Sequence, residues 1–232
     1  MFGRNKTKNV FESITYDRFE EAKELLISGT DPNLLDEYGQ TPLFRIVYNA
    51  SPFQLDFFQL FVSFGADVNL PKPDGTTPVF YAKGAILKKL IDNGAVLTVK
   101  DNSGGSPLHN ASEIEDVELF LKSGLDINEK NNSLSTPLHG YVYSSSSLVK
   151  FALDNKAEVN AVNKNGWTPL ICLARTEYVT EKNELQEILT TAQFLLDFGA
   201  DKNVKDNLNK TAYDHAISVN NNLFAERLLK HS

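Results

Sequence analysis

The chain has 232 residues, of which 41% are hydrophobic and 23% are charged, and 30 acidic against 23 basic residues give a net charge of −7. This composition is typical of a folded globular protein and excludes disorder as the default state. The negative charge disfavours binding to the phosphate backbone of nucleic acid, which requires a basic patch. We therefore expect no nucleic-acid partner.

Cys172 is the single cysteine of the chain. It can form neither an internal disulfide nor a multi-cysteine zinc site. The first residues show no apolar run of the kind found in signal peptides, and no stretch approaches the length of a membrane span. We expect no membrane partner and a reducing location, either the cytoplasm or a host-cell cytoplasm reached by a route that uses no such signal.

After a short tail over residues 1–8, the predicted elements repeat along the chain. A Ser-Pro or Thr-Pro pair predicts the start of a helix, because the hydroxyl caps free N–H groups and proline suits the first helical position. Such pairs place their prolines at Pro42, Pro78, Pro107, Pro137 and Pro169, and Thr211-Ala212 is a degenerate copy. The steps between these positions are 36, 29, 30, 32 and 43 residues.

A second motif marks the end of the second helix in each predicted unit. Its clearest copy is Gly65-Ala66-Asp67-Val68-Asn69, in which the glycine can take the left-handed conformation that ends a helix. The other copies begin at Gly29, Gly94, Gly124, Lys156 and Gly199, with the same five steps. Two independent motifs with one spacing predict a repeated turn, helix and helix.

These units resemble ankyrin repeats, because Thr136-Pro137-Leu138-His139 opens a predicted first helix and the Gly65 motif closes a second one. The resemblance implies an all-α solenoid of about seven helix-turn-helix units with β-hairpin fingers. The predicted units cover residues 9–35, 36–71, 72–100, 101–130, 131–162, 163–205 and 206–232. Since one unit cannot bury its apolar stripe alone, we expect residues 9–232 to form a single domain.

Several units depart from the pattern. The third and fourth are short, which predicts clipped first helices. Lys156 replaces the glycine that ends the second helix of the fifth unit, at a cost of about 1 kcal/mol if it is left-handed. Leu134 replaces the finger glycine of that unit, so we expect this finger to open differently. An insert at about residues 176–184 lengthens the sixth unit.

His109 and His139 each follow a Ser or Thr by three residues, which fits either a catalytic pair or a helix-capping pair. In ankyrin repeats, a histidine at this position resembles a bracket that bonds the capping hydroxyl and the neighbouring finger. Cys172 lies in an apolar helical stretch and is best interpreted as a buried small hydrophobe. We expect no catalytic, cofactor-binding or metal-binding residues.

The family resemblance implies that a protein partner contacts the finger tips and the concave face of the first helices. Carried over position by position, the candidate contact residues are Glu37, Tyr38, Arg45, Tyr48, Asp74, Tyr81, Asn110, Tyr141, Tyr143, Lys164, Trp167 and Arg175. Tyrosine, tryptophan and arginine dominate binding hot spots, although Trp167 can equally pack on the next finger. We expect a monomeric protein-binding adaptor, with a secreted bacterial effector as one form of it. The alternative is an enzyme or enzyme fragment with a pocket near the insert.

Overall fold

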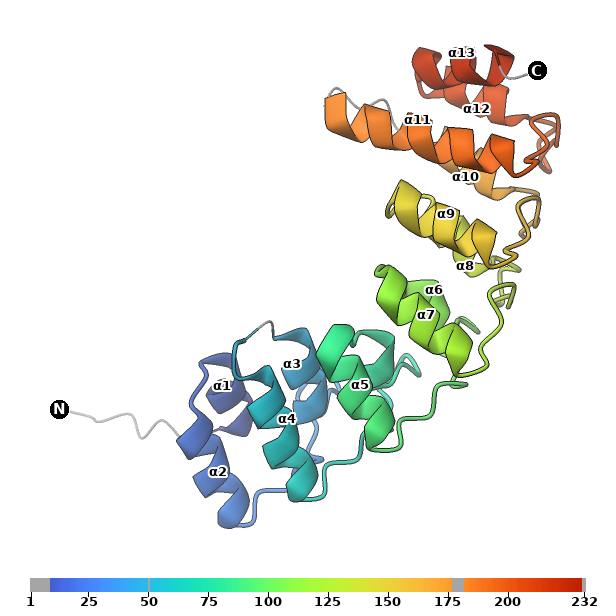
Figure 1. Ribbon diagram of the computed structural model, residues 1–232. Helices are drawn as coiled ribbons and strands as arrows, with labels where there is room; N and C mark the ends of the chain where they lie inside the picture. Colours follow the sequence, from blue (N-terminus) through green and yellow to red (C-terminus); the bar gives the residue numbers. More distant parts are fainter. Residues whose placement is uncertain (1–8, 50, 177–181, 231–232) are drawn as a thin grey trace. The chain divides into compact units, whose positions relative to one another are not determined.

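The computed structural model describes residues 9–49, 51–176 and 182–230 (Figure 1). Within these ranges the fold is all-helical, as predicted, and contains no strand. The chain divides into an N-terminal part, residues 1–102, and a C-terminal part, residues 103–232. Among the described helices, none combines the length and the apolar character needed to cross a membrane.

The helices follow one another in pairs of a first and a second helix. In the N-terminal part these are α1 (Val10–Thr15) and α2 (Phe19–Ile27), α3 (Pro42–Tyr48) and α4 (Gln54–Ser63), and the 3₁₀ helix η1 (Pro78–Phe80) and α5 (Gly84–Asp92). In the C-terminal part they are α6 (Pro107–Asn110) and α7 (Ile114–Lys122), α8 (Pro137–Tyr141) and α9 (Ser146–Asp154), α10 (Pro169–Ala174) and α11 (Lys182–Asp197), and α12 (Ala212–Ser218) and α13 (Asn222–Lys230). The clipped first helices of the two short units, η1 and α6, are confirmed. The count of about seven units and the single domain remain predictions.

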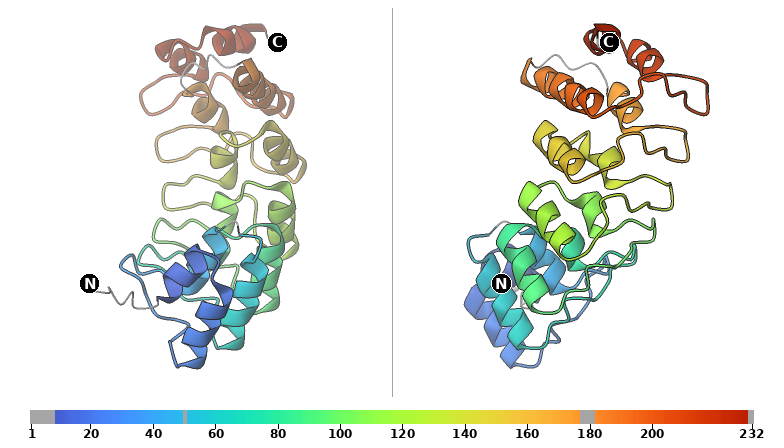
Figure 2. Two further views of the ribbon diagram at one scale, coloured as in Figure 1. Left: turned by 90° about the vertical axis from the view of Figure 1, so that its left-hand side faces the viewer. Right: turned by 45° about the vertical axis from the view of Figure 1, so that its right-hand side comes forward.

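Each part consists of two layers of helices (Figure 2). In the C-terminal part, the first helices α6, α8, α10 and α12 contact one another in that order, and so do the second helices α7, α9, α11 and α13. In the N-terminal part, α3 contacts α1 and η1, while α4 contacts α5. Apolar side chains fill the space between the layers, because only paired helices can remove their apolar stripes from water.

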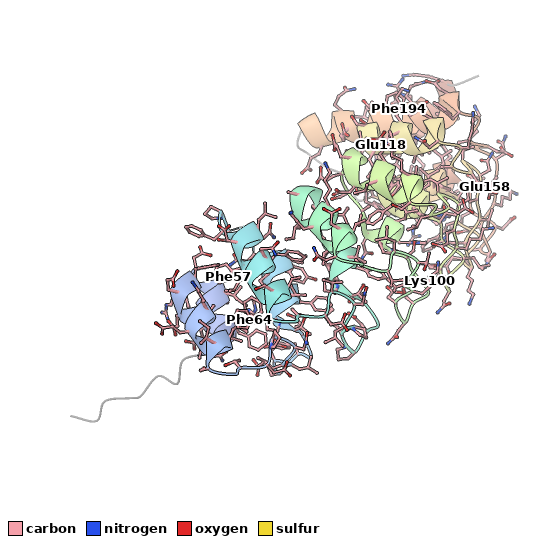
Figure 3. The ribbon with its side chains drawn as sticks, turned by 60° about the horizontal axis from the view of Figure 1, so that its bottom comes forward. Phe57, Phe64, Lys100, Glu118, Glu158 and Phe194 are labelled. Carbon is pink, nitrogen blue, oxygen red and sulfur yellow. The ribbon has the colours of Figure 1, made fainter. Side chains whose placement is uncertain are left out.

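Aromatic side chains make up much of the core of the N-terminal part. Phe44, Phe58 and Phe61 are fully buried, and Phe57 on α4 packs edge to face on Phe19 of α2, with ring centroids 5.4 Å apart. Phe64, at the end of α4, is exposed instead (Figure 3). Phe57 within α4 is thus buried, whereas Phe64, the residue directly after α4, lies outside this core.

The second helices end in left-handed residues, as the Gly motif predicts. After α4, Gly65 has φ +89° and Ala66 N–H donates to Phe61 O at 3.0 Å. Lys156 takes the same conformation after α9, with φ +69°, and the following Ala157 N–H donates to Ala152 O at 3.0 Å. The predicted left-handed Lys156 is confirmed, and the backbone bond explains why the strain is tolerated.

The asparagine that closes the motif joins one unit to the next. Asn33 Nδ2–H donates to Gly65 O at 3.0 Å, and Asn33 Oδ1 accepts from Asp67 N–H at 2.7 Å. The same pair of bonds is formed by Asn69, Asn128 and Asn160 with the units that follow them. One side chain therefore satisfies two backbone groups of the neighbouring unit, which sets the register of the stack.

The fingers are tight turns. In the first of them, Asp36 N–H donates to Gln40 O and Gly39 N–H donates to Asp36 O, both at 3.0 Å. Leu134, with φ +58°, closes its finger in the same way, since its N–H donates to Asn131 O at 2.8 Å. The expectation that this finger opens differently is therefore wrong. The predicted β-hairpins are not confirmed, because the described fingers carry no strand.

Candidate protein-binding surface

The first helices and the fingers beside them form one face of each part, which we name the first-helix face. Most of the predicted contact residues reach solvent on this face. Glu37, Tyr38, Tyr48, Asp74, Asn110, Tyr143, Lys164 and Arg175 are exposed, Arg45, Tyr81 and Trp167 are half-buried, and Tyr141 is buried. Six of them fall into two groups, one in each part of the chain: Tyr48, Asp74 and Tyr81, and Tyr143, Trp167 and Arg175.

In the N-terminal part, two tyrosines meet around a lysine. The rings of Tyr48, at the end of α3, and Tyr81, after η1, have centroids 4.8 Å apart. The Lys72 ammonium lies 4.7 Å from the centre of the Tyr81 ring and 3.2 Å from the Tyr81 hydroxyl oxygen. Lys72 Nζ also lies 3.1 Å from a carboxylate oxygen of Asp74. We name Tyr48, Lys72, Asp74 and Tyr81 the tyrosine cluster.

The electrostatics of the tyrosine cluster hold its groups in their ordinary charge states. Burial lowers the pKa of Lys72, but its hydrogen bonds with Tyr81 and Asp74 outweigh burial and hold the pKa above its usual value. Partial burial and the neighbouring Tyr81 hydroxyl raise the pKa of Tyr48. At neutral pH the Tyr48 phenol therefore stays neutral beside the ion pair of Lys72 and Asp74, a mixture of apolar surface and hydrogen-bonding groups typical of protein interfaces.

Arg45 lines a surface depression in the N-terminal part. Its Nη2 is 3.3 Å from Asp36 Oδ2, and its guanidinium carbon is 5.9 Å from the centre of the Phe11 ring. It lines an open depression of about 690 Å³ between α1 and the finger at residues 36–40, together with Glu37. Because its charge is already paired with Asp36, Arg45 is a weak candidate for an anion-binding contact.

In the C-terminal part, Trp167 lies at the centre of a larger group. The Arg175 guanidinium carbon is 3.9 Å from the centre of a Trp167 ring, which is a cation–π stack. Trp167 Nε1–H donates to Asp206 Oδ2 at 3.2 Å, and the Trp167 and His215 rings meet edge to face at 6.5 Å. Tyr143 donates its hydroxyl to Cys172 O at 2.8 Å. We name Tyr143, Trp167, Arg175, Asp206 and His215 the tryptophan cluster.

Within the tryptophan cluster, Asp206 and His215 form a buried pair that contacts Trp167 and Arg175. His215 Nε2 is 2.8 Å from Asp206 Oδ2, and both side chains are almost fully buried. Burial raises the pKa of Asp206, but hydrogen bonds from the Lys210 backbone and from His215 outweigh it and lower the pKa to about 2. Arg175 Nη1 is 3.3 Å from His215 Nδ1. Since a guanidinium can only donate, His215 Nδ1 accepts and Nε2–H donates to Asp206.

Comparison with known proteins identifies the repeats. A family model described as ankyrin repeats, in three copies, matches residues 13–101, 48–131 and 138–232. The chain belongs to the ankyrin-repeat family. The crystal structure of the human ASB11 ankyrin repeat domain superposes with a TM-score of 0.77 at 23% identity, covering 96% of this chain and 97% of that one. This likeness supports the fold.

Curated relatives share the repeats within longer proteins. Human neurogenic locus notch homolog protein 1 is 34% identical over 131 residues, which are 53% of this chain and 5% of that protein. Putative ankyrin repeat protein L91 of Acanthamoeba polyphaga mimivirus is 27% identical over 196 residues, 82% of this chain and 27% of that protein. The chain therefore spans only a small share of these relatives. Ankyrin repeats generally mediate protein–protein interaction and are typically non-enzymatic.

Tyr141 is the one predicted contact residue that the ankyrin stack removes from the surface. It is 1% exposed, and its hydroxyl donates to Leu108 O at 2.7 Å. Burial raises its pKa, so the phenol stays protonated and keeps this bond. Tyr141 belongs to the core between α6 and α8, and the prediction that it contacts a partner is wrong for this reason.

The histidine brackets predicted from the ankyrin resemblance are confirmed. His139 Nδ1 lies 3.1 Å from Thr136 N and 3.0 Å from Thr136 Oγ1, and Nε2 lies 3.1 Å from Trp167 O. Because the backbone N–H donates and the carbonyl accepts, this histidine is neutral with its proton on Nε2. His109 makes the same contacts with Ser106 and the Ser135 carbonyl. Both rings therefore hold fingers in place.

Two kinds of reactive group remain to be considered, the thiol of Cys172 and potential metal ligands. Cys172 is buried, as predicted, and burial raises its pKa to about 11. No cluster of three or more potential metal ligands occurs among the residues that the structure describes. The insert lies largely at residues 177–181, outside the described residues, so the alternative of a pocket beside it stays a prediction.

Lys72, Asp206 and His215 belong to the two clusters but are not among the contact residues predicted from the sequence. Lys72 and Asp206 both occupy the first position of a finger, where Asp36 also stands. That shared position is a signal that could have pointed to them, because the side chain there faces the first helix of its own unit. His215 carried no comparable signal.

Proposed function

We propose that the chain is a protein-binding adaptor that engages another protein through its first-helix faces and finger tips. The observation that carries this proposal is the gathering of exposed and half-buried aromatic and cationic side chains on that face in each part. The rings of Tyr48 and Tyr81 meet at an interplanar angle of 37° beside Lys72, and Arg175 stacks on Trp167. Neighbouring contacts already hold these side chains, so binding would restrict them little further.

Residue types also support a binding role for these clusters. Tyrosine, tryptophan and arginine are enriched among the few residues that supply most of the binding energy at interfaces. Tyr143 is 58% exposed and Tyr48 is 51% exposed, although both are large and partly apolar. Groups of exposed aromatic rings whose orientation is set by the fold are typical of protein-binding surfaces.

Affinity capture with paired variants tests the proposal. Full-length chain is immobilised, proteins from candidate lysates are captured and identified by mass spectrometry, and the capture is repeated with Tyr48→Ala and Tyr143→Ala. Because Tyr143 and Tyr48 are exposed, we expect each variant to weaken capture while the protein stays folded, with a loss of at most about 1 kcal/mol of stability where Tyr143 no longer bonds to Cys172 O. Phe198→Ala is the matched control, since Phe198 is 41% exposed at the end of the second helix α11.

Capture that is unchanged in both tyrosine variants, or equally weakened by Phe198→Ala, would contradict a role for the first-helix faces. We further propose that the adaptor works as a monomer in a reducing cytoplasm, in its own cell or, as an exported effector, in a host. The single buried thiol of Cys172 supports a reducing setting, because the fold needs no disulfide. Fractionation of cells that express the chain tests the location, and light scattering tests the monomer.

A further inference from the structure

Among the residues that the structure describes, the contacts of the Arg175 guanidinium are with Trp167 and His215 and not with a carboxylate. The guanidinium stacks on Trp167 at 3.9 Å, and a hydrogen bond of 3.3 Å joins Nη1 to His215 Nδ1. A guanidinium has five N–H donors, and within the described ranges most of those of Arg175 have no protein acceptor. The residue itself is exposed to solvent. Its position is therefore organised before any partner arrives.

The other arginines of the described ranges contrast with Arg175. Each has an oxygen acceptor: Arg18 lies 3.5 Å from Glu21, Arg45 lies 3.3 Å from Asp36, and Arg227 donates to Gln193 at 3.0 Å. Arg175 bonds to a neutral ring nitrogen instead. Its positive charge is thus less completely compensated by a direct contact than those of Arg18 and Arg45.

The nearest buried carboxylate cannot serve as that contact, because its acceptor sites are filled. Asp206 Oδ1 accepts from the backbone N–H groups of Leu208 and Lys210, both at 2.9 Å. Its Oδ2 accepts from Trp167 at 3.2 Å and from His215 at 2.8 Å. A carboxylate has about four acceptor positions, and Asp206 uses four to orient the groups beneath Arg175.

Tyr143 extends this site along the first-helix face. Its hydroxyl donates to Cys172 O at 2.8 Å, and the Arg175 backbone N–H donates to the same carbonyl at 3.2 Å. The Tyr143 phenol and the Arg175 backbone therefore converge on one oxygen atom. This arrangement places an oriented aromatic ring next to the start of the arginine side chain.

We propose that Arg175, Trp167 and Tyr143 recognise an acidic side chain of a partner protein, with an adjacent apolar side chain of that partner resting on the two aromatic residues. The inference rests on the proposed function and names the chemistry of the partner at that surface. A guanidinium matches a carboxylate in a two-point hydrogen-bonded geometry. One arginine suits a single carboxylate charge, and the net charge of −7 opposes more highly charged anions.

Trp167 supplies the readout, because it is the single tryptophan of the chain and lies under Arg175. Full-length chain is used to select binders from a display library of random 12-residue peptides, and selected peptides are titrated while Trp167 fluorescence is recorded. We expect the selected peptides to carry Asp or Glu next to an apolar residue. Changing that acid to its amide should weaken binding roughly 30-fold, as expected for a hot-spot contact.

The protein variants complete a double-mutant cycle. Arg175→Gln should weaken binding of the acidic peptide about as much as the amide change in the peptide, and the two changes together should add little. Arg175→Lys should fall between, because it keeps the charge and loses the planar fork. Arg227→Gln is the matched control, since Arg227 lies on the second helix α13 and should leave binding unchanged. Circular dichroism of each variant verifies folding.

The outcomes separate this inference from the proposed function. Peptides that bind Arg175→Gln and wild type equally, or that tolerate loss of their acid, overturn the carboxylate site. If those peptides still lose affinity for Tyr48→Ala or Tyr143→Ala, the protein-binding function stands without it. A selection that yields no peptide sensitive to any first-helix-face variant, or no peptide at all, counts against both.

Discussion

Two threonines at equivalent positions should respond in opposite ways to the same substitution. Thr136 caps α8, and its hydroxyl contacts His139 Nδ1 at 3.0 Å. Thr41 caps α3, where Phe44 takes the place of the histidine, and its buried hydroxyl has no hydrogen-bond partner among the described residues. Thr77 precedes η1 and is followed three residues later by Phe80 instead of a histidine. Its buried hydroxyl likewise has no hydrogen-bond partner within the described ranges.

Valine has nearly the shape of threonine and lacks the hydroxyl, so Thr→Val isolates the hydrogen bond. Thr136→Val should destabilise the fold by about 1 kcal/mol, the usual net value of one such bond. Thr41→Val should stabilise it by about 1 kcal/mol, because it removes a buried polar group that nothing satisfies. Both sites are almost fully buried, at 2% and 1% exposure, so solvent compensates neither change.

Urea and thermal unfolding, followed by far-ultraviolet circular dichroism, measure the difference. The two variants should be separated by about 2 kcal/mol, or about 4–8 °C in thermal midpoint for a chain of this length. Thr77→Val is a second test of a buried hydroxyl without a partner and should stabilise the fold as Thr41→Val does. If Thr41→Val and Thr77→Val lower the midpoint as much as Thr136→Val does, the reasoning from hydroxyl satisfaction is refuted.

Three further predictions concern single positions. Lys156→Gly should raise the free energy of unfolding by up to about 1 kcal/mol in urea titrations, because glycine takes the left-handed conformation without strain, and a loss of stability would contradict the strain. Asp206, whose pKa is lowered to about 2, should contribute stability that is complete above the ordinary carboxyl pKa of about 4 and lost as the pH falls toward 2. Asp206→Asn should weaken the dependence of the urea midpoint on pH between about pH 4 and pH 2. If the midpoint of the variant still varies with pH as steeply as that of the wild type, Asp206 is not the group responsible. Cys172, with its pKa raised to about 11, should react slowly with a thiol reagent at neutral pH and quickly in urea, and rapid reaction of the native protein would show that the thiol is accessible.

The repeat architecture could be predicted from sequence because its signals are local. A Thr-Pro pair caps a helix and a glycine ends one whatever lies further along the chain. The clipped first helices and the left-handed Lys156 follow from such short-range rules, and the structure confirms them. The bracket of His139, whose contact with the Trp167 carbonyl spans 28 residues, was predicted from the family resemblance instead. Leu134 is the exception. Its finger was expected to open differently because glycine is missing, but Leu134 takes the left-handed conformation that the turn requires.

Side-chain exposure on the first-helix face could not be predicted in the same way. Tyr141 and Tyr143 stand two residues apart at the end of α8, yet Tyr141 is 1% exposed and Tyr143 is 58% exposed. A helix as short as α8 carries too few residues to show a clear apolar stripe. Which tyrosine is buried depends on the contact between α8 and α6, where Leu108 supplies the acceptor for Tyr141.

By itself, the sequence determined that paired helices repeat, where they start and end, and which family they belong to. Only the tertiary structure decided which side chains meet. Trp167 and Asp206 are 39 residues apart, and Arg175 and His215 are 40 residues apart, yet each pair is in contact. The physical reason is that a cap or a turn is formed by adjacent residues, whereas a cluster forms only where stacked units bring distant residues together.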